Sequence, residues 1–287
     1  MDESSAQHLA RHPAPEGAAA DWTVPQRWSD YSSAEHAVWD RLFERQVAQL
    51  QDRAVSAFHE GIKALGLGPG GIPRFERLNQ RLEPLTGWTV VAVPGLVPEE
   101  VFFHHLAHRR FVAGRFIRDA SQLDYLEQPD VFHDVFGHVP LLADPAYAAY
   151  MQAYGEAGAR LQQGRSFTEL SRLYWYTVEF GLMRDGDRLR IFGAGILSSN
   201  GESEYALDSR EPLRIRFDLR RTMLTDYRSD TFQKNYFVIE SFADLVGRTA
   251  NVDFAGVYKE LEGLAPIAAG IRLPTDVLFA PNRADGN

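Results

Sequence analysis

Cysteine is absent from this chain of 287 residues. Without it there can be no disulfide bond, no thiolate nucleophile, no zinc–cysteine site and no iron–sulfur cluster. Any metal that the protein holds must therefore be bound by histidine, aspartate or glutamate side chains. The absence of cysteine does not by itself indicate a cellular compartment.

An excess of basic residues is also absent, as are long apolar runs. The 30 lysines and arginines are outnumbered by 39 aspartates and glutamates, which gives a formal net charge of −9. This balance argues against nucleic acid or an anionic membrane as the main partner. No run reaches the ~18 apolar residues of a membrane span, and the N-terminus has early acids and no apolar signal sequence. We therefore expect a cytoplasmic protein that acts on small molecules.

What is present is typical of a soluble globular protein. Hydrophobic residues make up 45% of the chain and charged residues 24%, and the chain is long enough to bury a large core. Residues 1–30, rich in Ala, Pro, Gly and Ser, predict a disordered arm. Residues 31–265 predict one mainly α-helical catalytic domain with a small β element, and residues 266–287 an irregular tail. Because no heptad repeat is present that would form a coiled coil, we expect a monomer.

The first half of the domain has clear helix and strand signals. The capping-box pattern SSAE (32–35) predicts the start of a long helical segment through Ala64, with Gly66 just past its end. The β-branched run WTVVAVPG (88–95) predicts a short strand and a turn, and PEEVFFHHLAHR (98–109) predicts a helix.

The second half alternates between helical and β-like patterns. Residues 144–163 predict a helix, and a second capping-box pattern, SFTE (166–169), precedes the helix that carries Glu179. RLRIFGAGILSSNGE (188–202) and PLRIRFDL (212–219) predict short β-like pieces. TFQKNYFVIESFADLVG (231–247) predicts a strand followed by a helix.

Glu179 is an acidic residue on a helix face that is otherwise apolar. Its helical neighbours include Trp175, Tyr176 and Met183. A carboxylate buried among such residues is costly unless it is paired, hydrogen-bonded or bound to a metal. The partner is either a metal ion or Arg172, nearly two turns earlier on the same face, unless the carboxylate reaches solvent at the end of the helix.

His133 and His138 lie in PDVFHDVFGHVPLL (129–142) and are five residues apart. On an ideal α-helix this spacing separates them by about 140°. A shared ligand therefore requires a π-like turn or an unwound helix end, for which Gly137 and Pro140 supply a cause. Asp130 is suited to cap this short helix. The alternative is that one histidine is a core residue and the other a helix-end cap.

Two imidazoles and one carboxylate are the ligand set of non-haem Fe(II) oxygenases, because they leave the opposite positions of the metal open. A rival group, His104, His105 and His108, includes a pair four residues apart, but no carboxylate in its segment joins that pair. We interpret this second group as the solvated polar face of a helix.

Three motifs resemble those of one enzyme family: residues 129–142, LYWYTVEFGL (173–182) and GAGILSSNGE (193–202). They are similar to the pterin-dependent aromatic amino acid hydroxylases, most closely the short bacterial phenylalanine 4-hydroxylases. The resemblance extends from about Trp22 to about Leu278. It implies a mostly helical catalytic domain, a mononuclear non-haem Fe(II), and conversion of L-phenylalanine to L-tyrosine with dioxygen and tetrahydrobiopterin.

The same resemblance implies roles for individual residues. His133, His138 and Glu179 correspond to the catalytic iron ligands. The substrate-binding positions are Arg118, for the substrate carboxylate, and Pro129, Trp175, Phe180, Ser198 and Ser199. The cofactor-binding positions, on the pterin side, are Gly95, Leu96, Phe102, Asp134 and Tyr174. From the residues alone, Arg118 would be interpreted as a surface arginine and Phe102 as a core residue.

The sequence departs from the animal members of the family in three ways. It has neither their N-terminal regulatory domain nor their tetramerisation helix, and Leu126 stands where the animal phenylalanine hydroxylases have a threonine. We expect the polar segment 121–128 to be a mobile loop near the substrate. Three alternatives stay open: hydroxylation of tryptophan or tyrosine, a binding protein without catalysis, and a zinc hydrolase, although no glutamate follows His133 as a base.

Overall fold

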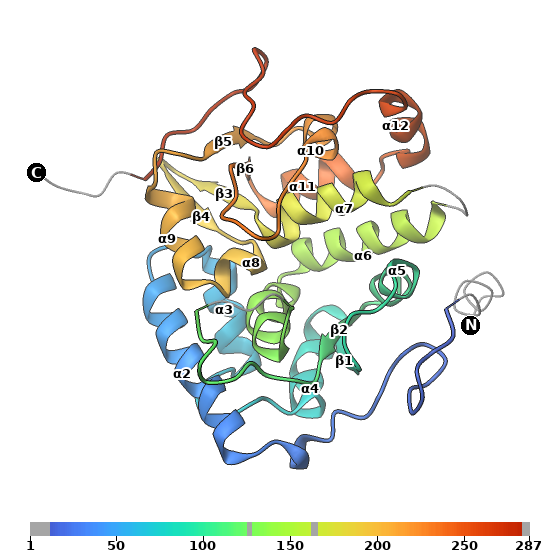
Figure 1. The fold of residues 1–287 in the computed structure, drawn as a ribbon, viewed down its shortest axis with the longest axis vertical. Coiled ribbons are helices and arrows are strands. Elements are labelled where there is room, and N and C mark those ends of the chain that lie inside the picture. Colours follow the sequence, from blue (N-terminus) through green and yellow to red (C-terminus); the bar gives the residue numbers. More distant parts are fainter. Residues whose placement is uncertain (1–11, 125–127, 162–165, 283–287) are drawn as a thin grey trace, which may run out of the picture.

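The computed structural model describes residues 12–124, 128–161 and 166–282. Its helices and strands form three regions (Figure 1): α2–α5 with a two-stranded sheet below, α6 and α7 across the middle, and a four-stranded sheet with the C-terminal helices above. Buried side chains from all three regions form one continuous hydrophobic core. None of the helices in the described ranges is long and apolar enough to cross a membrane.

Helix α2 (Ser33–Leu50) begins with the predicted capping box, in which Ser32 and Glu35 bond each other's backbone N–H groups. The predicted helix through Ala64 is wrong in one respect, because it is divided into α2 and α3 (Ser56–Leu65). Between them the chain forms a turn at residues 51–53, and Ala54 then pairs with Ile191, whose N–H donates to the carbonyl of Arg53. A strand-like contact with a distant segment therefore ends α2, which local helix signals cannot predict.

Helices α4 (Phe75–Thr86) and α5 (Glu99–Ala107) flank the smaller sheet, which consists of strands β1 (Thr89–Val93) and β2 (Arg110–Gly114). The two strands are parallel, with Val93 opposite Gly114, and α5 connects them. The loop with Gly95 and Leu96 and the end of β2 therefore lie at the same edge of this sheet.

The middle region carries the predicted metal ligands. It contains two π-helical turns, η2 (His133–His138) and η4 (Trp175–Glu179), together with the 3-10 turn η3 (Val139–Ala143), α6 (Pro145–Arg160) and α7 (Thr168–Tyr174). The predicted capping box at residues 166–169 is wrong. Helix α7 begins one residue later, with Phe167 at its N-cap and no side-chain cap bond, because the Ser166 hydroxyl bonds Thr168 instead.

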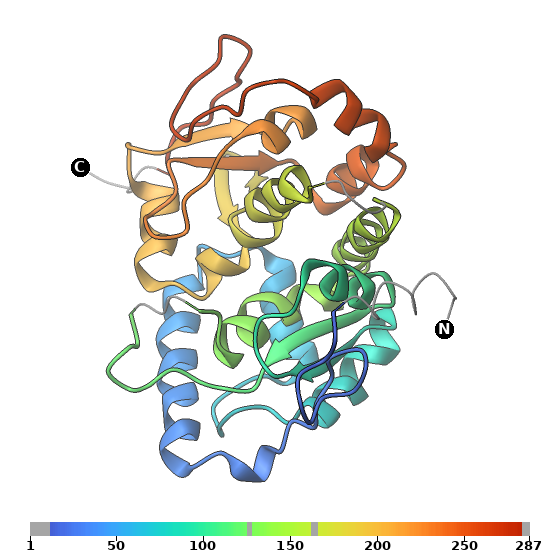
Figure 2. The ribbon, with the colours of Figure 1, turned by 45° about the vertical axis from the view of Figure 1, so that its right-hand side comes forward.

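The larger sheet has the strand order β4 (Arg188–Ile191), β3 (Leu182–Asp185), β6 (Asn235–Ile239), β5 (Leu213–Arg216). Strands β3 and β4 are antiparallel, while β6 is parallel to both β3 and β5. The surrounding helices are α8 (Ala194–Leu197), α9 (Asn200–Asp208), α10 (Leu219–Leu224), α11 (Phe242–Thr249) and α12 (Phe254–Leu261), which Figure 2 shows from a second side. The β-like interpretation of residues 193–202 is wrong, since they form α8 and the start of α9.

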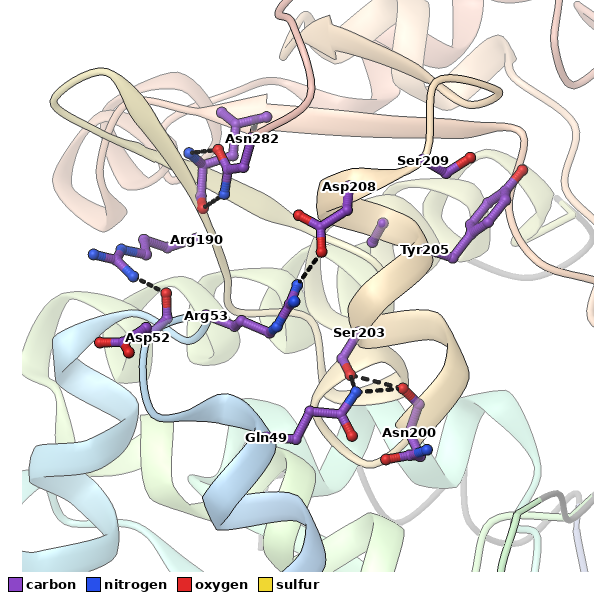
Figure 3. A network of polar contacts seen from close by, with 12 residues as sticks. Gln49, Asp52, Arg53, Arg190, Asn200, Ser203, Tyr205, Asp208, Ser209 and Asn282 are labelled. Atoms are coloured by element: carbon purple, nitrogen blue, oxygen red, sulfur yellow. Dashed lines mark hydrogen bonds and ion pairs between the residues drawn. The ribbon is translucent and has the colours of Figure 1, made fainter. Parts of the chain in front are cut away.

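A polar network joins α2 and the turn after it to α9 and β4 (Figure 3). The Gln49 amide donates to the Asn200 carbonyl (2.6 Å) and to the Ser203 hydroxyl (2.7 Å), and Arg53 pairs with Asp208 (2.7 Å). Nearby, the buried Gln46 amide donates to the Leu197 carbonyl at 2.9 Å. The two glutamines of α2 therefore hold the turn between α8 and α9 from both of its ends.

The chain follows a defined path over residues 12–30, where its composition predicted disorder. Asp21 pairs with Arg110 (2.8 Å), the Val24 N–H donates to the carbonyl of Ala92, and the Trp28 indole donates to that of Ile72. Residues 1–11 of the predicted arm lie outside the described residues. Residues 266–282 of the tail contain two isolated bridges, to Thr225 and Ile215, and no helix or strand.

Candidate metal centre

Three potential metal ligands converge from the two π-helical turns. His138 Nε2 lies 3.3 Å from Glu179 Oε1, His133 Nε2 lies 3.6 Å from Glu179 Oε2, and the two Nε2 atoms are 3.3 Å apart. Among the described residues, this is the one group of three or more His, Cys, Asp or Glu side chains whose ligand atoms approach closely enough to hold an ion.

The first π-turn brings His133 and His138 together despite their spacing. In a π-helix residues five apart lie one above the other, and the chain then tightens into η3 at Val139, before Pro140. Gly137 allows this packing, because a Cβ there would lie 2.9 Å from the Ala194 carbonyl oxygen of α8. The predicted helix distortion is confirmed, and the Asp130 carboxylate caps it by accepting the His133 N–H (3.0 Å).

The second π-turn directs Glu179 toward the two histidines. The Phe180 N–H donates to the carbonyl of Trp175, five residues earlier, at 2.8 Å. The alternative ion pair between Glu179 and Arg172 does not form. Arg172 instead pairs with Asp226 and donates to the carbonyl of Met223 (3.3 Å).

The charge states of His133 and Glu179 suit a cation. Burial lowers the pKa of His133 to about 4, so its imidazole is neutral at pH 7. Burial alone would raise the pKa of Glu179, but His138 and His133 bring it below its ordinary value, so the carboxylate is ionised. Neutral imidazoles and a carboxylate are the forms that bind metals. Bonds of about 2.1 Å place adjacent ligands about 3.0 Å apart, so the separations of 3.3–3.6 Å fit one ion.

Ser198 selects which nitrogen of His133 faces the centre. Its hydroxyl donates to the Ala194 carbonyl (2.8 Å) and therefore accepts from His133 Nδ1–H (2.9 Å). With the proton on Nδ1, the lone pair of Nε2 points to the other two ligands.

A cavity of about 320 Å³ opens beside this centre. This volume lies at the lower end of the range for small-molecule sites. The cavity is lined by all three potential ligands and by seven of the other predicted site residues: Gly95, Leu96, Phe102, Pro129, Asp134, Tyr174 and Trp175. A cation at the three ligands would therefore face a largely aromatic space.

Comparisons with known proteins agree with this geometry. Residues 19–256 match the family described as biopterin-dependent aromatic amino acid hydroxylases. The chain belongs to this family. It is 54% identical to phenylalanine-4-hydroxylase of Caulobacter vibrioides over 92% of this chain and 90% of the relative, and 51% identical to that of Chromobacterium violaceum over 91% and 88%.

The fold of this hydroxylase is also that of solved relatives. A structure of C. violaceum phenylalanine hydroxylase with bound iron(III) and 7,8-dihydrobiopterin matches with a TM-score of 0.87 and 46% identity, over 97% of this chain and 99% of that one. Another, with iron and phenylalanine bound, has a TM-score of 0.87 and 45% identity, over 97% and 100%. The prediction of a mainly α-helical hydroxylase domain is confirmed.

Four predicted site residues of the hydroxylase do not line the cavity: Arg118, Phe180, Ser198 and Ser199. Arg118 is only 7% exposed, so its interpretation as a surface arginine is wrong, and its Nε and Nη2 bind both carboxylate oxygens of Asp130 at 2.8 and 2.9 Å. Phe180 packs on Trp175, with ring centroids 4.7 Å apart, and Ser199 is the N-cap of α9.

Sequence reasoning missed two features of the cavity wall. Tyr227 stacks on Trp175 at 4.2 Å and 14°, and it lies in a mostly polar loop that carries no motif. Asp134 accepts the N–H of Gly114 (2.7 Å), and burial raises the pKa of Asp134 to about 7. Nothing in the sequence around Gly114, at the end of β2, predicts this contact.

The rival histidine group is not a solvated face, and that interpretation is wrong. His104 and His105 are buried, burial lowers the pKa of each to about 4, and His105 Nε2 donates to the Asp21 carbonyl (2.8 Å). His108 is exposed, and its Nδ1 donates to the carbonyl of His104 (2.7 Å). His105 thus bonds the N-terminal segment, residues 12–30, to α5.

The segment predicted to be a mobile loop is described in part. Leu126 lies within residues 125–127, outside the described ranges. Before them, Arg45 of α2 donates to the Leu123 carbonyl (2.7 Å) and pairs with Asp124 (2.6 Å).

Proposed function

We propose that this hydroxylase is a phenylalanine 4-monooxygenase that converts L-phenylalanine to L-tyrosine with dioxygen and tetrahydrobiopterin. In this proposal His133, His138 and Glu179 hold a mononuclear Fe(II). The single observation that carries it is the convergence of these side chains beside an aromatic cavity, in a chain whose curated relatives are named phenylalanine-4-hydroxylases.

The bound iron, together with the reduced pterin, would supply the activation of dioxygen. The protein supplies three ligands from one side, so the remaining positions face the cavity. Ser198 holds the His133 tautomer that this requires, and the apolar lining excludes water from the reacting groups.

The substrate and pterin sides of the cavity differ in chemistry. We assign Pro129 and Trp175, backed by Phe180, to the substrate ring, and Gly95, Leu96, Phe102 and Tyr174 with Asp134 to the pterin. Ser198 and Ser199 act from behind this wall, through His133 and through the start of α9.

Arg118 is the candidate for the substrate carboxylate. Asp130 occupies Nε and Nη2 of its guanidinium, so Nη1 is the nitrogen that a second carboxylate could reach. Asp130 also caps the turn that begins at His133, and burial, which would raise the pKa of Asp130, is outweighed by Arg118, which lowers it. The Arg118–Asp130 pair would therefore fix the amino acid relative to the metal.

The deciding experiment loads the protein with Fe(II) without oxygen. Oxygen and tetrahydrobiopterin are then added with phenylalanine, tyrosine or tryptophan, and the products are identified by mass spectrometry. We expect tyrosine from phenylalanine, and loss of both product and tightly bound iron in His133→Ala, His138→Ala and Glu179→Ala, with unchanged circular dichroism. His108→Ala, in the other histidine group, is the control and keeps full activity.

The outcomes separate the alternatives. Preferred hydroxylation of tryptophan or tyrosine would replace the substrate, and no product from any amino acid would overturn the proposal in favour of a binding protein or a hydrolase. Full activity in any of the three ligand variants would refute the assignment of the metal ligands.

We further propose that residues 31–265 form the catalytic domain and that the protein works as a cytoplasmic monomer. The lack of a heptad repeat in residues 266–287 supports the monomer. Size-exclusion chromatography with light scattering tests it, since a mass of twice the chain's 32.3 kDa would contradict it.

A further inference from the structure

Gln233 lies in the loop between α10 and β6 and is only 3% exposed. Its side-chain nitrogen donates to the carbonyls of Arg228 (2.7 Å) and Thr231 (3.2 Å). Because an amide oxygen cannot bond a carbonyl, these contacts fix the orientation of the amide. Its oxygen must then face Trp175, whose indole Nε1–H it accepts at 2.9 Å.

The backbone of Gln233 is fixed from the opposite side. Its N–H donates to the carboxylate of Glu202 at 3.0 Å, and Glu202 of α9 is itself only 4% exposed. The same carboxylate oxygen accepts the hydroxyl of Tyr236 on β6. The buried carboxylate of Glu202, between α9 and β6, thus fixes Gln233, which in turn fixes Trp175.

Trp175 forms one wall of the cavity, where its indole contacts the rings of Tyr227 and Phe180. These ring contacts are apolar and allow the indole to tilt or to turn over, whereas a hydrogen bond to Nε1–H is satisfied in one orientation only. The indole plane at the cavity is therefore set by Gln233.

We propose that Gln233 is a positioning residue that sets the selectivity for the substrate ring by locking the indole of Trp175. This inference rests on the proposed hydroxylation of an aromatic amino acid. With Trp175 locked, the cavity accepts a single six-membered ring between fixed walls. With it released, the wall yields and the larger bicyclic ring of tryptophan is admitted.

Gln233→Met removes the hydrogen bond while keeping a similar side-chain volume. The indole N–H of Trp175 is then unpaired and this wall of the cavity is no longer fixed. The KM for phenylalanine should rise by about tenfold, with a smaller change in kcat. The ratio of kcat/KM for tryptophan to that for phenylalanine should rise by about tenfold. An unchanged ratio would overturn the proposal.

A double-mutant cycle with Trp175→Phe shows whether Gln233 acts through the indole. Phenylalanine at 175 keeps an aromatic wall and has no N–H, so Gln233→Met should then change the selectivity ratio little further. Equal effects in both backgrounds would assign Gln233 a general structural role. Asp230→Ala breaks the exposed Arg228–Asp230 pair of the same loop and should leave selectivity unchanged.

A measurement without turnover completes the test. In the full-length protein, exchange of the Trp175 indole N–H, followed by nuclear magnetic resonance, should be slow and should accelerate in Gln233→Met. Exchange at the same rate in both would refute the locked indole. Failure of the wild-type protein to form tyrosine would instead count against the proposed function.

Discussion

At the scale of single residues, Ser198 shows how a side chain outside the cavity controls what lies inside it. The sequence places it among the substrate-binding positions, but its hydroxyl lies behind His133 and bonds Nδ1. The two residues are 65 positions apart, and no spacing rule joins them. Such contacts between distant segments arise only when the chain is packed, so the sequence alone could not predict this one.

Removing the Ser198 hydroxyl should weaken metal binding. Ser198→Ala leaves Nδ1–H of His133 without its acceptor, and such outer contacts are worth about 10–100-fold in metal affinity. Anaerobic titration calorimetry with Fe(II) measures the change. Ser199→Ala is the neighbouring control, because it removes only the N-cap of α9. It should lower the free energy of unfolding by about 1 kcal/mol and leave metal affinity unchanged. Equal loss of affinity in both variants would contradict this role.

At the scale of secondary-structure elements, the two π-turns carry the whole ligand set. The first could be predicted, because a five-residue spacing followed by Gly137 and Pro140 is incompatible with a regular α-helix. The second could not, because Trp175–Glu179 contains neither glycine nor proline and has an ordinary helical pattern. We attribute this wider turn to the packing of its aromatic side chains against the rest of the molecule.

Gly137 and Gly247 provide a matched pair of substitutions in helical elements. In Gly137→Ala the new Cβ would lie 2.9 Å from the backbone oxygen of Ala194, so α8 must shift, at a cost of about 1–3 kcal/mol. In Gly247→Ala, within α11, nothing lies within 4 Å of the new Cβ, and stability should rise by about 0.4–1 kcal/mol. Urea unfolding checks both, and destabilisation by Gly247→Ala would contradict the argument.

At the scale of the whole molecule, His105 of α5 joins that helix to the N-terminal segment, residues 12–30, through the carbonyl of Asp21. This histidine is fully buried, and burial lowers its pKa to about 4 from 6.5. Arg110 lowers it further, while the bond to the carbonyl of Asp21 opposes the shift. The buried position of His105 therefore favours a neutral imidazole.

Acid should lower the stability of the folded protein through His105 in a defined pH window, because burial opposes the charged ring. Below pH 6.5 the unfolded chain takes up a proton that the folded protein resists until about pH 4, so stability is complete above 6.5 and is lost as the pH falls toward 4. The slope is up to about 1.4 kcal/mol per pH unit. Urea unfolding at several pH values should give a shallower slope in His105→Asn, with the share of His104 remaining. Identical slopes in both proteins would refute the role of His105.

The family and the domain type could be predicted from the sequence more fully than the contacts between distant residues. Long contiguous motifs around His133, Glu179 and Ser198 carry the family resemblance and hence the domain type. The Arg118–Asp130 pair and the hold of Gln233 on Trp175 join segments whose approach depends on the packed fold. The sequence therefore predicts which residues matter at the centre better than it predicts what orients them.

The stacked pair of Trp175 and Tyr227 also gives the cavity an intrinsic fluorescent reporter. The chain has five tryptophans, all within the described ranges, and Trp175 is the one that lines the cavity, whereas Trp39 and Trp88 are fully buried elsewhere. An amino acid that binds against the Trp175 indole changes the polarity of the indole's surroundings and the contact of the indole with the phenol ring of Tyr227. Intrinsic fluorescence thus offers a probe of ligand entry that requires neither a label nor catalytic turnover.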